Sequence, residues 1–325
     1  MADTDRLPAS STPTLRQLQF LAALARHGSF VRAADAVGVA QPTLSAGIKE
    51  LEASLDTTLV ERGRAGIVLT PAGEEAAARA RRVLSDVDEL VRAARGAGAP
   101  FSGTFRLGAI PTIAPFLLPR ALPELRSRYP QIKVHLKEDI TSRLIDALRA
   151  RSLDAAVIAL PYAAQGIESE AVAEDEFLFL APTGHPLTLR NDLAPEHLAE
   201  EDVLLLEDGH CLREHALSVC KTEPGKLCAD VGATSLATLV QMVAGGLGVT
   251  LLPKLAAEGG AAAGAPVALR PFEEPVIGRT IGVAWRQGGA REEEARLLAA
   301  LLRETVFKNA ALKSAGDPAR APASR

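Results

Sequence analysis

The sequence predicts an α/β protein preceded by an all-α domain and a long connecting helix. Three observations support this fold class. Residues 14–55 contain three short helical patterns that are separated by glycine-containing turns. Residues 71–95 follow as one long stretch rich in Ala, Glu, Arg, Val and Leu. After a Gly/Ala/Pro/Ser linker at 96–102, strand and helix patterns alternate, which is typical of α/β domains.

The length and the few cysteines limit the class of protein. A chain of 325 residues is long enough for two or three domains with full hydrophobic cores. Three cysteines are too few for a disulfide scaffold. The N-terminus lacks the apolar stretch of a signal peptide, and no run of about 18 apolar residues occurs. We therefore expect a cytoplasmic protein without membrane contact, in which a disulfide would be transient rather than structural.

The N-terminal part begins with a polar arm and continues into helices. Residues 1–13 are rich in Ser, Thr, Pro and Asp and are expected to be disordered. Helices are predicted at 14–26, 30–37 and 41–55, and strands at 59–61 and 67–69. A capping box with Pro71 at its first helical position then opens the long helix. This helix is longer than one small domain needs, so we expect it to connect domains and to pair two chains.

The three short helices have the pattern of a helix-turn-helix. Ala33 and Ala34 are small enough for a close helix crossing, and Gly38 permits a tight turn before the third helix. That helix would turn an apolar stripe inward and a polar face toward the major groove of DNA. The residues expected to contact DNA are Gln41, Pro42, Thr43, Ser45, Lys49, Arg62 and Arg64.

Charge supports DNA binding only weakly. Residues 14–65 contain six Lys or Arg against five Asp or Glu, a net charge of +1, in a chain of net charge −4. The electrostatic attraction of one copy to DNA is therefore small, and two copies along an operator would be needed. Any three-helix module with exposed polar residues is the alternative interpretation.

The C-terminal part predicts an α/β domain with largely parallel sheets, because its strands are separated by helices. The expected strands are 104–109, 133–138, 155–159, 177–181, 203–206, 249–252 and 279–285. The expected helices are 116–129, 142–150, 211–220, 236–244 and 291–306, and the polar residues from 308 onward are expected to be disordered.

Two cysteines nine residues apart, Cys211 and Cys220, lie in the segment EDGHCLREHALSVC. As a helix, this segment would place their Cα atoms about 13–14 Å apart on roughly opposite faces. A disulfide tolerates only about 4.4–6.8 Å between Cα atoms, so pairing would require the helix to come apart. Such a segment has the physical form of a redox switch. His210, Arg213 and the helix N-terminus would favour the thiolate of Cys211.

Plainer roles for the cysteines remain open at this point. Cys220 lies on the apolar stripe of the expected helix and could be a small buried hydrophobe. Cys228 is expected to pack passively, although it could compete as a second thiol partner. A zinc site is disfavoured because Cys211 and His215 share a helix face from which Cys220 points away, so no metal is expected.

The segment LRQLQFLAALARHGSFVRAADAVGVAQPTLSAGIKELEASLDTTLVERGRAGIVLTPAG resembles the DNA-binding domain of LysR-type transcriptional regulators. Residues 103–305 are similar to the periplasmic-binding-protein-like effector domain of that family, which has two Rossmann-like subdomains. The resemblance implies a homodimer or homotetramer on palindromic operator DNA that contacts RNA polymerase. The implied divisions are an arm at 1–13, a winged helix-turn-helix at 14–70, a linker helix at 71–96, a hinge at 97–102, a redox-sensing regulatory domain at 103–307 and a tail at 308–325.

Four further segments are similar to the peroxide-sensing members of the family: LGAIPTIAPFLLP, LLLEDGHCLREHALSVC, ATSLATLVQMVAGGLGVTLLP and RTIGV. This similarity implies that hydrogen peroxide oxidises Cys211, that Cys220 closes a disulfide, and that a glutaredoxin- or thioredoxin-type reductant reopens it. The residues implied to bind or activate peroxide are Thr112, Thr141, His210, Arg213 and Arg279. The chain would then be an activator of oxidative-stress defence genes, with no enzymatic activity and no cofactor.

Other interpretations of the same residues are left open by the sequence. Without the resemblance, Thr112 and Thr141 would be read as helix caps and Arg279 as an exposed strand residue. A LysR-type regulator that binds a small organic ligand between its two effector subdomains is the alternative function. A thiol peroxidase is disfavoured, because residues 14–95 would then have no use.

Overall fold

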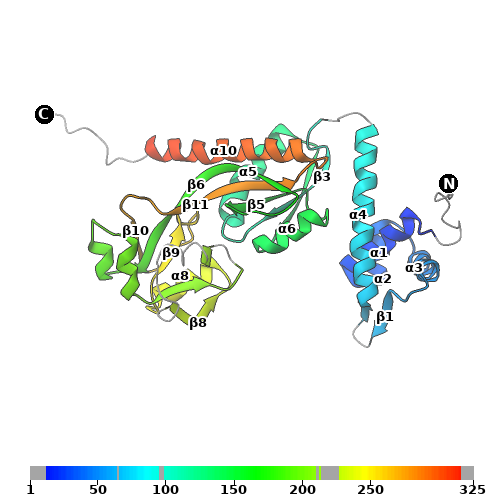
Figure 1. Ribbon diagram of the computed structural model, residues 1–325, viewed down its shortest axis with the longest axis horizontal. Helices are drawn as coiled ribbons and strands as arrows, with labels where there is room; N and C mark the ends of the chain where they lie inside the picture. The colour runs from blue at the N-terminus through cyan, green and yellow to red at the C-terminus, as the bar shows by residue number, and fades with distance from the viewer. Residues whose placement is uncertain (1–11, 64–65, 95–98, 210–211, 214–226, 316–325) are drawn as a thin grey trace. The chain divides into compact units, whose positions relative to one another are not determined.

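The computed structural model describes residues 12–63, 66–94, 99–209, 212–213 and 227–315 (Figure 1). The chain forms two compact units, one made mostly by the residues up to Gly98 and the other by most residues from Ala99 onward. The first unit is mainly helical, whereas the second combines helices with strands.

Three short helices form the core of the N-terminal unit: α1 (Leu15–His27), α2 (Phe30–Val37) and α3 (Gln41–Leu55). Thr14 and Gln17 form a capping box at the start of α1, in which each side chain accepts the backbone N–H of the other residue. Gly38 ends α2 in the left-handed conformation that glycine adopts without strain. The shared core consists of Phe20, Leu21, Leu24, Ala33, Ala34, Leu44, Ile48, Leu51, Leu59 and Ala77.

A β-hairpin and a long helix follow α3. The hairpin pairs β1 (Val60–Gly63) antiparallel to β2 (Gly66–Leu69), and the helix α4 (Pro71–Ala94) has 24 residues. Oε1 of Glu52 in α3 accepts the N–H groups of Leu59 at 2.8 Å and Val60 at 3.0 Å. The start of the hairpin is therefore attached to the helix that precedes it.

The C-terminal unit contains a seven-stranded sheet and a separate pair of strands. The strand order of the sheet is β10-β6-β11-β5-β3-β4, and β9 pairs with β6 beside this path. The pair consists of the parallel strands β7 and β8. The strands are β3 (Gly103–Ala109), β4 (Ile132–Glu138), β5 (Ala155–Leu160), β6 (Ile167–Pro182), β7 (Val203–Leu206), β8 (Leu227–Ala233), β9 (Thr250–Pro253), β10 (Val267–Pro271) and β11 (Gly278–Arg286).

The main sheet is mixed, which corrects the expectation of largely parallel sheets. Only β3 pairs in parallel with its neighbours β4 and β5, whereas the pairs formed by β6, β9, β10 and β11 are antiparallel. The physical reason is the path of the chain. It leaves the first half of the unit along β6 and returns along β11, so these neighbouring strands must run in opposite directions.

Strand β6 belongs to both halves of the C-terminal unit. Its residues 167–176 pair with β11, and its residues 177–182 pair with β9 and β10. The buried side chains form two clusters, one around β3, β5 and β11 and the other around β7, β9 and the helix α8 (Leu236–Ala244). Two α/β halves joined by the shared strand β6 confirm the fold class of the effector domain.

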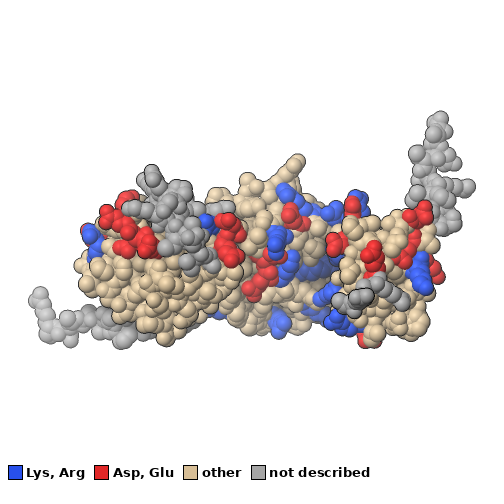
Figure 2. All heavy atoms as spheres, turned by 90° about the horizontal axis from the view of Figure 1, so that it is seen from below, with Lys and Arg blue, Asp and Glu red and all other residues tan. Residues whose placement is uncertain are grey.

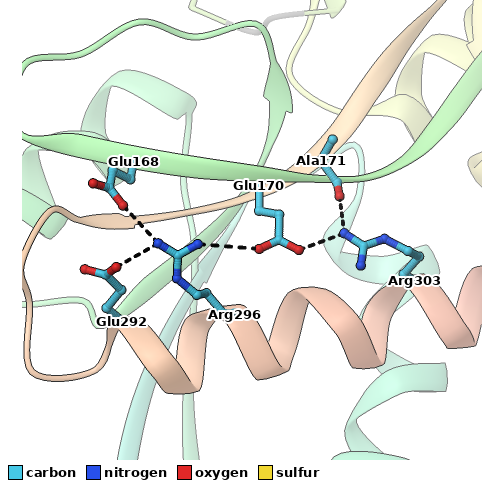
Figure 3. Close-up of polar contacts among 6 residues, drawn as sticks. All are labelled: Glu168, Glu170, Ala171, Glu292, Arg296 and Arg303. Atoms are coloured by element: carbon cyan, nitrogen blue, oxygen red, sulfur yellow. Dashed lines mark hydrogen bonds and ion pairs between the residues drawn. The ribbon is translucent and has the colours of Figure 1, made fainter.

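The helices of the C-terminal unit cover these strands (Figure 1). They are α5 (Ala114–Arg128), α6 (Thr141–Arg149), α8 (Leu236–Ala244), α9 (Lys254–Glu258) and α10 (Glu292–Ala315), with 3-10 turns η1 (Pro186–Leu189) and η2 (Pro195–Glu200). Arginines of α10 reach glutamates of β6 along one side of the sheet (Figure 3).

Helix α10 continues to Ala315, although a disordered tail was expected from residue 308. The sequence KNAALKSA at 308–315 contains neither glycine nor proline, and the first helix breakers are Gly316 and Pro318. Because nothing in this segment opposes a helix, α10 extends through it. Residues 316–325 lie outside the described part of the chain.

Candidate functional site

The residues expected to contact DNA lie on the outer face of α3 where the structure describes them. Gln41, Pro42, Thr43 and Lys49 are exposed and Ser45 is half-buried, while Leu44, Ile48 and Leu51 fill the core behind them. The backbone of Arg62 lies in β1, and Arg64 lies outside the described residues. On the face that Figure 2 shows, acidic and basic side chains both occur on the N-terminal unit, at the right, which agrees with the small net charge of residues 14–65.

Two threonines in the C-terminal unit follow the carboxyl ends of neighbouring parallel strands. Thr112 comes three residues after β3, and Thr141 comes three residues after β4. The N–H of Asp139 donates to the carbonyl of Ala109 at 3.3 Å, which connects the two loops. In α/β proteins, binding sites usually form in the loops at the carboxyl ends of strands. This edge of the sheet is therefore the candidate site.

Arg279 of β11 joins this edge from a third strand. Its side chain is buried; Nη1 donates to Oγ1 of Thr112 at 2.7 Å, and Nη2 donates to the Thr112 carbonyl at 3.1 Å. Thr112 is 2% exposed, and α5 begins without a side-chain cap. Reading Thr112 as a helix cap and Arg279 as an exposed strand residue is therefore wrong.

Asp175, which the sequence analysis missed, is the anionic partner of Arg279. The two residues lie directly opposite each other on β6 and β11. Oδ2 of Asp175 accepts from Nε of Arg279 at 3.0 Å, and Oδ1 accepts the N–H of Leu255 at 2.9 Å. Burial raises the pKa of the Asp175 carboxyl above its usual value, against the opposing effect of the Arg279 charge. The available sequence signal was an acidic residue just before the apolar run at 177–181.

Thr141 is the first residue of α6 and is 4% exposed. Its Oγ1 has no hydrogen-bond partner among the described residues. A capping hydroxyl would accept a backbone N–H, so the reading of Thr141 as a helix cap is wrong as well. Leaving a buried hydroxyl unpaired costs about 1–3 kcal/mol, and such a group marks a place where a small polar molecule can bind.

The turn before Cys211 lies against the start of α6. Gly209 has a φ of +90°, and a Cβ built on it would stand 2.9 Å from Cδ1 of Ile140, the residue before Thr141. Glycine is thus required both by the backbone conformation and by the close approach. His210, Cys211 and Cys220, and most of the helix expected at 211–220, lie outside the described residues.

Arg213, two residues after Cys211, stabilises the same turn through two contacts. Its Nε forms an ion pair with Asp208 at 2.9 Å, and its Nη1 donates to the carbonyl of Leu206 at 3.3 Å. The neighbouring Leu212 is 3% exposed and belongs to the core cluster of the second half. The backbone on both sides of Cys211 is thereby attached to the domain.

The remaining ligand-type residues do not form a metal site in the described part of the chain. No group of three or more His, Cys, Asp or Glu is found there that could hold a metal ion. Cys228 lies in β8, which pairs with β7. Among the described helices, none is both long enough and apolar enough to cross a membrane.

Comparison with known proteins matches both parts of the chain to one family. Residues 15–74 match the bacterial regulatory helix-turn-helix protein, lysR family, and residues 98–306 match the LysR substrate binding domain. A probable hydrogen peroxide-inducible genes activator of Streptomyces viridosporus is 42% identical over 296 residues, which cover 90% of this chain and 95% of the relative.

Two solved structures of OxyR are similar along most of the chain. A full-length cysteine-to-aspartate variant from Pseudomonas aeruginosa has a TM-score of 0.73 and 35% identity, and covers 89% of this chain and 94% of its own. A hydrogen-peroxide-bound cysteine-to-serine variant from Corynebacterium glutamicum has a TM-score of 0.64 and 32% identity, with coverages of 94% and 97%. The chain therefore belongs to the LysR family of bacterial transcriptional regulators, which bind DNA and are not enzymes.

Proposed function

We propose that the chain is a peroxide-sensing regulator that activates oxidative-stress defence genes in the cytoplasm. Its relative in Streptomyces viridosporus is named a probable hydrogen peroxide-inducible genes activator, and the similar structure from Corynebacterium glutamicum holds hydrogen peroxide. The observation that carries the proposal is the buried site at the strand ends. There the hydroxyl of Thr141 has no partner among the described residues, and the residue before it, Ile140, lies against the turn that leads into Cys211.

The chemistry of the site suits a small peroxide. Hydroxyl groups of Thr112 and Thr141 can donate to and accept from peroxide oxygens. The Cys211 thiolate attacks one oxygen and the O–O bond breaks; the sulfur becomes a sulfenic acid, and the other oxygen leaves as hydroxide, takes up a proton and becomes water. Arg279 stabilises the negative charge on the departing oxygen. His210 and Arg213 favour the thiolate before attack.

The second step converts the oxidation into a change of shape. The Cys220 thiol condenses with the sulfenic acid, which forms the disulfide and releases a second water. In an intact helix the two Cα atoms are about 13–14 Å apart, so the disulfide requires this segment to rearrange. The rearrangement changes how the regulatory domains of two subunits pair. A glutaredoxin- or thioredoxin-type reductant restores the two thiols.

The N-terminal unit delivers this change to DNA. The outer face of α3 enters the major groove with Gln41, Pro42, Thr43 and Ser45, while Lys49, Arg62 and Arg64 contact phosphates or the minor groove. Helix α4 has exposed apolar side chains at Val83, Leu90 and Val91, which supports pairing of two copies into a dimer or tetramer. Re-spacing the paired DNA-binding units on the operator then alters the contact with RNA polymerase.

The Cys211→Ser variant of the full-length protein tests the proposal. We expect it to bind the operator like the reduced wild type but to keep the same footprint after stoichiometric peroxide. The matched control, Cys228→Ser, should respond like the wild type. Mass spectrometry should find the Cys211–Cys220 disulfide in the peroxide-treated wild type and in peroxide-treated Cys228→Ser. A peroxide response that survives in Cys211→Ser would contradict the proposal. So would a wild-type protein that loses no thiol in peroxide and instead binds a small metabolite.

A further inference from the structure

One buried carboxylate joins the candidate site to the rest of the regulatory domain. Asp175 contacts Arg279 with one oxygen and the backbone of α9 with the other. We propose that Asp175 is a positioning residue that holds the Arg279 guanidinium in the orientation needed for the reaction with peroxide. This inference rests on the proposed function and adds a residue to its machinery.

The guanidinium of Arg279 is held on two sides. Oδ2 of Asp175 is 3.0 Å from Nε and 3.0 Å from Nη2, so one carboxylate oxygen faces two nitrogens. On the other side, both terminal nitrogens donate to Thr112. A guanidinium has five N–H bonds in one rigid plane, so contacts on two sides fix that plane. Nη1 carries a second N–H besides the one that it donates to Thr112, and we assign this second N–H to an oxygen bound beside Thr112.

The burial of the pair argues for a role beyond stability. The side chains of Arg279 and Asp175 are 0% and 2% exposed. Taking two charges out of water is costly, and apolar residues of similar volume are often at least as stable. The neighbouring strand residues Phe177 and Ile281 are buried and apolar, so this part of the sheet accommodates such side chains. Apolar side chains cannot supply a cation. The charged pair holds the Arg279 guanidinium in a fixed orientation before negative charge develops on the departing peroxide oxygen.

The same carboxylate makes the orientation of Arg279 depend on both halves of the domain. Thr112 precedes α5 in the first half, whereas Asp175 Oδ1 binds the backbone of α9. Leu255 of α9 packs on the first core cluster, and the next residue, Ala256, lies in the second. Asp175 therefore lies at the junction of the two halves, where it fixes the position of the Arg279 guanidinium relative to both of them.

Asp175→Asn in the reduced full-length protein tests this role, because it removes the charge and keeps the shape. We expect the second-order rate of Cys211 oxidation by peroxide, followed by mass spectrometry of quenched samples, to fall by about tenfold or more. Alkylation of the same thiol by iodoacetamide should change by less than about twofold, since it needs no cation beside Thr112. The ratio of the two rates separates positioning of Arg279 from a general loss of structure.

Glu176→Gln is the matched control for Asp175→Asn. Glu176 is the next residue of β6 and also reaches α9, where it pairs with Lys254 at 2.7 Å, but its side chain is 41% exposed. We expect both rates of this variant to equal those of the wild type. In the double variant Asp175→Asn/Arg279→Lys, Cys211 should be oxidised about as slowly as in Arg279→Lys alone. The effects of two substitutions are not additive when one residue acts through the other.

Three outcomes would overturn the inference. An Asp175→Asn protein with the wild-type ratio of rates excludes the positioning role, and so does a double variant in which the two effects multiply. A wild-type protein that is not oxidised at Cys211 refutes the proposed function and the inference together. If Asp175→Asn does not bind the operator as a folded protein, Asp175→Glu replaces it. The ratio of the oxidation rate to the alkylation rate of Cys211 should then fall several-fold. A ratio equal to that of the wild type refutes the positioning role.

Discussion

Strand β6 carries two clusters of arginine–carboxylate contacts that share the same chemistry and differ in burial. In the buried cluster, Asp175 pairs with Arg279, and both side chains are almost completely enclosed. In the exposed cluster, two glutamates near the start of β6 pair with two arginines of α10, and these side chains are 33–50% exposed (Figure 3). The exposed cluster consists of Glu168, Glu170, Glu292, Arg296 and Arg303.

The comparison shows that the number of ion pairs is a poor measure of their importance. Arg296 alone contacts three carboxylates, at 2.7, 3.3 and 3.9 Å, and its guanidinium also lies over the ring of Trp285. Water and salt screen such contacts, so each is weak. In the buried cluster each charge depends on its one partner, because water cannot replace it. The exposed cluster therefore helps to attach α10, whereas the buried one serves the site.

The largest expected effect is that of Asp175→Ala. Removing one member of a buried pair leaves the other charge unpaired, so we expect the free energy of unfolding to fall by about 3–5 kcal/mol. Urea unfolding followed by fluorescence of Trp285, the single tryptophan, reports on this unit. The double replacement Asp175→Leu/Arg279→Met should recover most of the loss, since it removes both charges. Equal losses for Asp175→Ala and Glu168→Ala would show that burial does not distinguish the clusters.

Thr112→Val is expected to have the next largest effect. It keeps the shape of the side chain and removes the acceptor of the Arg279 Nη1 donor, at a cost of about 1–3 kcal/mol in unfolding free energy. Thr280→Val is the control on the same strand as Arg279, because the Thr280 hydroxyl bonds the exposed Glu174. The same urea titration should leave Thr280→Val close to the wild type. A Thr112→Val protein as stable as that control would contradict the assigned hydrogen bond.

Arg303→Ala tests the exposed cluster and should have a smaller effect. Arg303 bonds Glu170 and the carbonyl of Ala171, but its side chain is 38% exposed. We expect a loss of about 0.2–1 kcal/mol in unfolding free energy, and a smaller loss in high salt. Urea titrations at low and high ionic strength measure both quantities. A loss comparable to that of Asp175→Ala, or one insensitive to salt, would remove the contrast between the clusters.

The two clusters should also differ in the sign of their pH dependence, which is the smallest effect. A hydrogen bond from Arg296 lowers the pKa of Glu292, so its contribution to stability is present above the unfolded pKa and is lost as the pH falls through the folded pKa. Burial raises the pKa of Asp175, so the folded protein binds this proton more tightly than the unfolded chain. Its contribution is greatest below the unfolded pKa and declines as the pH rises through the folded pKa.

Unfolding midpoints of the wild type, Glu292→Gln and Asp175→Asn, measured from about pH 3 to pH 7, test this difference. The stability gap between the wild type and Glu292→Gln should widen as the pH rises. The gap between the wild type and Asp175→Asn should narrow over the range just above the ordinary pKa of aspartate. Gaps that change in the same direction with pH for both variants would show that burial does not govern the titration of Asp175.

Local signals were sufficient for most helices. Helices α2, α3 and α8 begin and end at the expected residues, and Gly38 and Gly245 follow the first and the last of these directly. Strand β6 was expected only at 177–181 and extends over residues 167–182. Its first part alternates charged and small side chains, and it becomes a strand because β11 pairs with it from more than a hundred residues away. No short window of sequence contains that partner.

The candidate site was predicted in part, and by resemblance rather than by pattern. Thr112, Thr141 and Arg279 were named because their segments resemble those of peroxide-sensing relatives, while the residue types alone favoured helix caps and an exposed strand position. The structure shows Arg279 buried and neither threonine hydroxyl capping a helix, which contradicts those plainer readings. Asp175 was missed because an aspartate at the edge of an apolar run has no signature until its partner across the sheet is known.

By itself, the sequence determined the family, the polar face of α3 and the spacing of Cys211 and Cys220, because each depends on a motif or a helical period within a short window. Only the tertiary structure decided that Arg279 is enclosed between Asp175 and Thr112 and that the hydroxyl of Thr141 has no partner among the described residues. The bonds of Arg279 join residues 104 and 167 positions apart. Contacts over such separations are set by strand register and by the joining of the two halves, which no local pattern encodes.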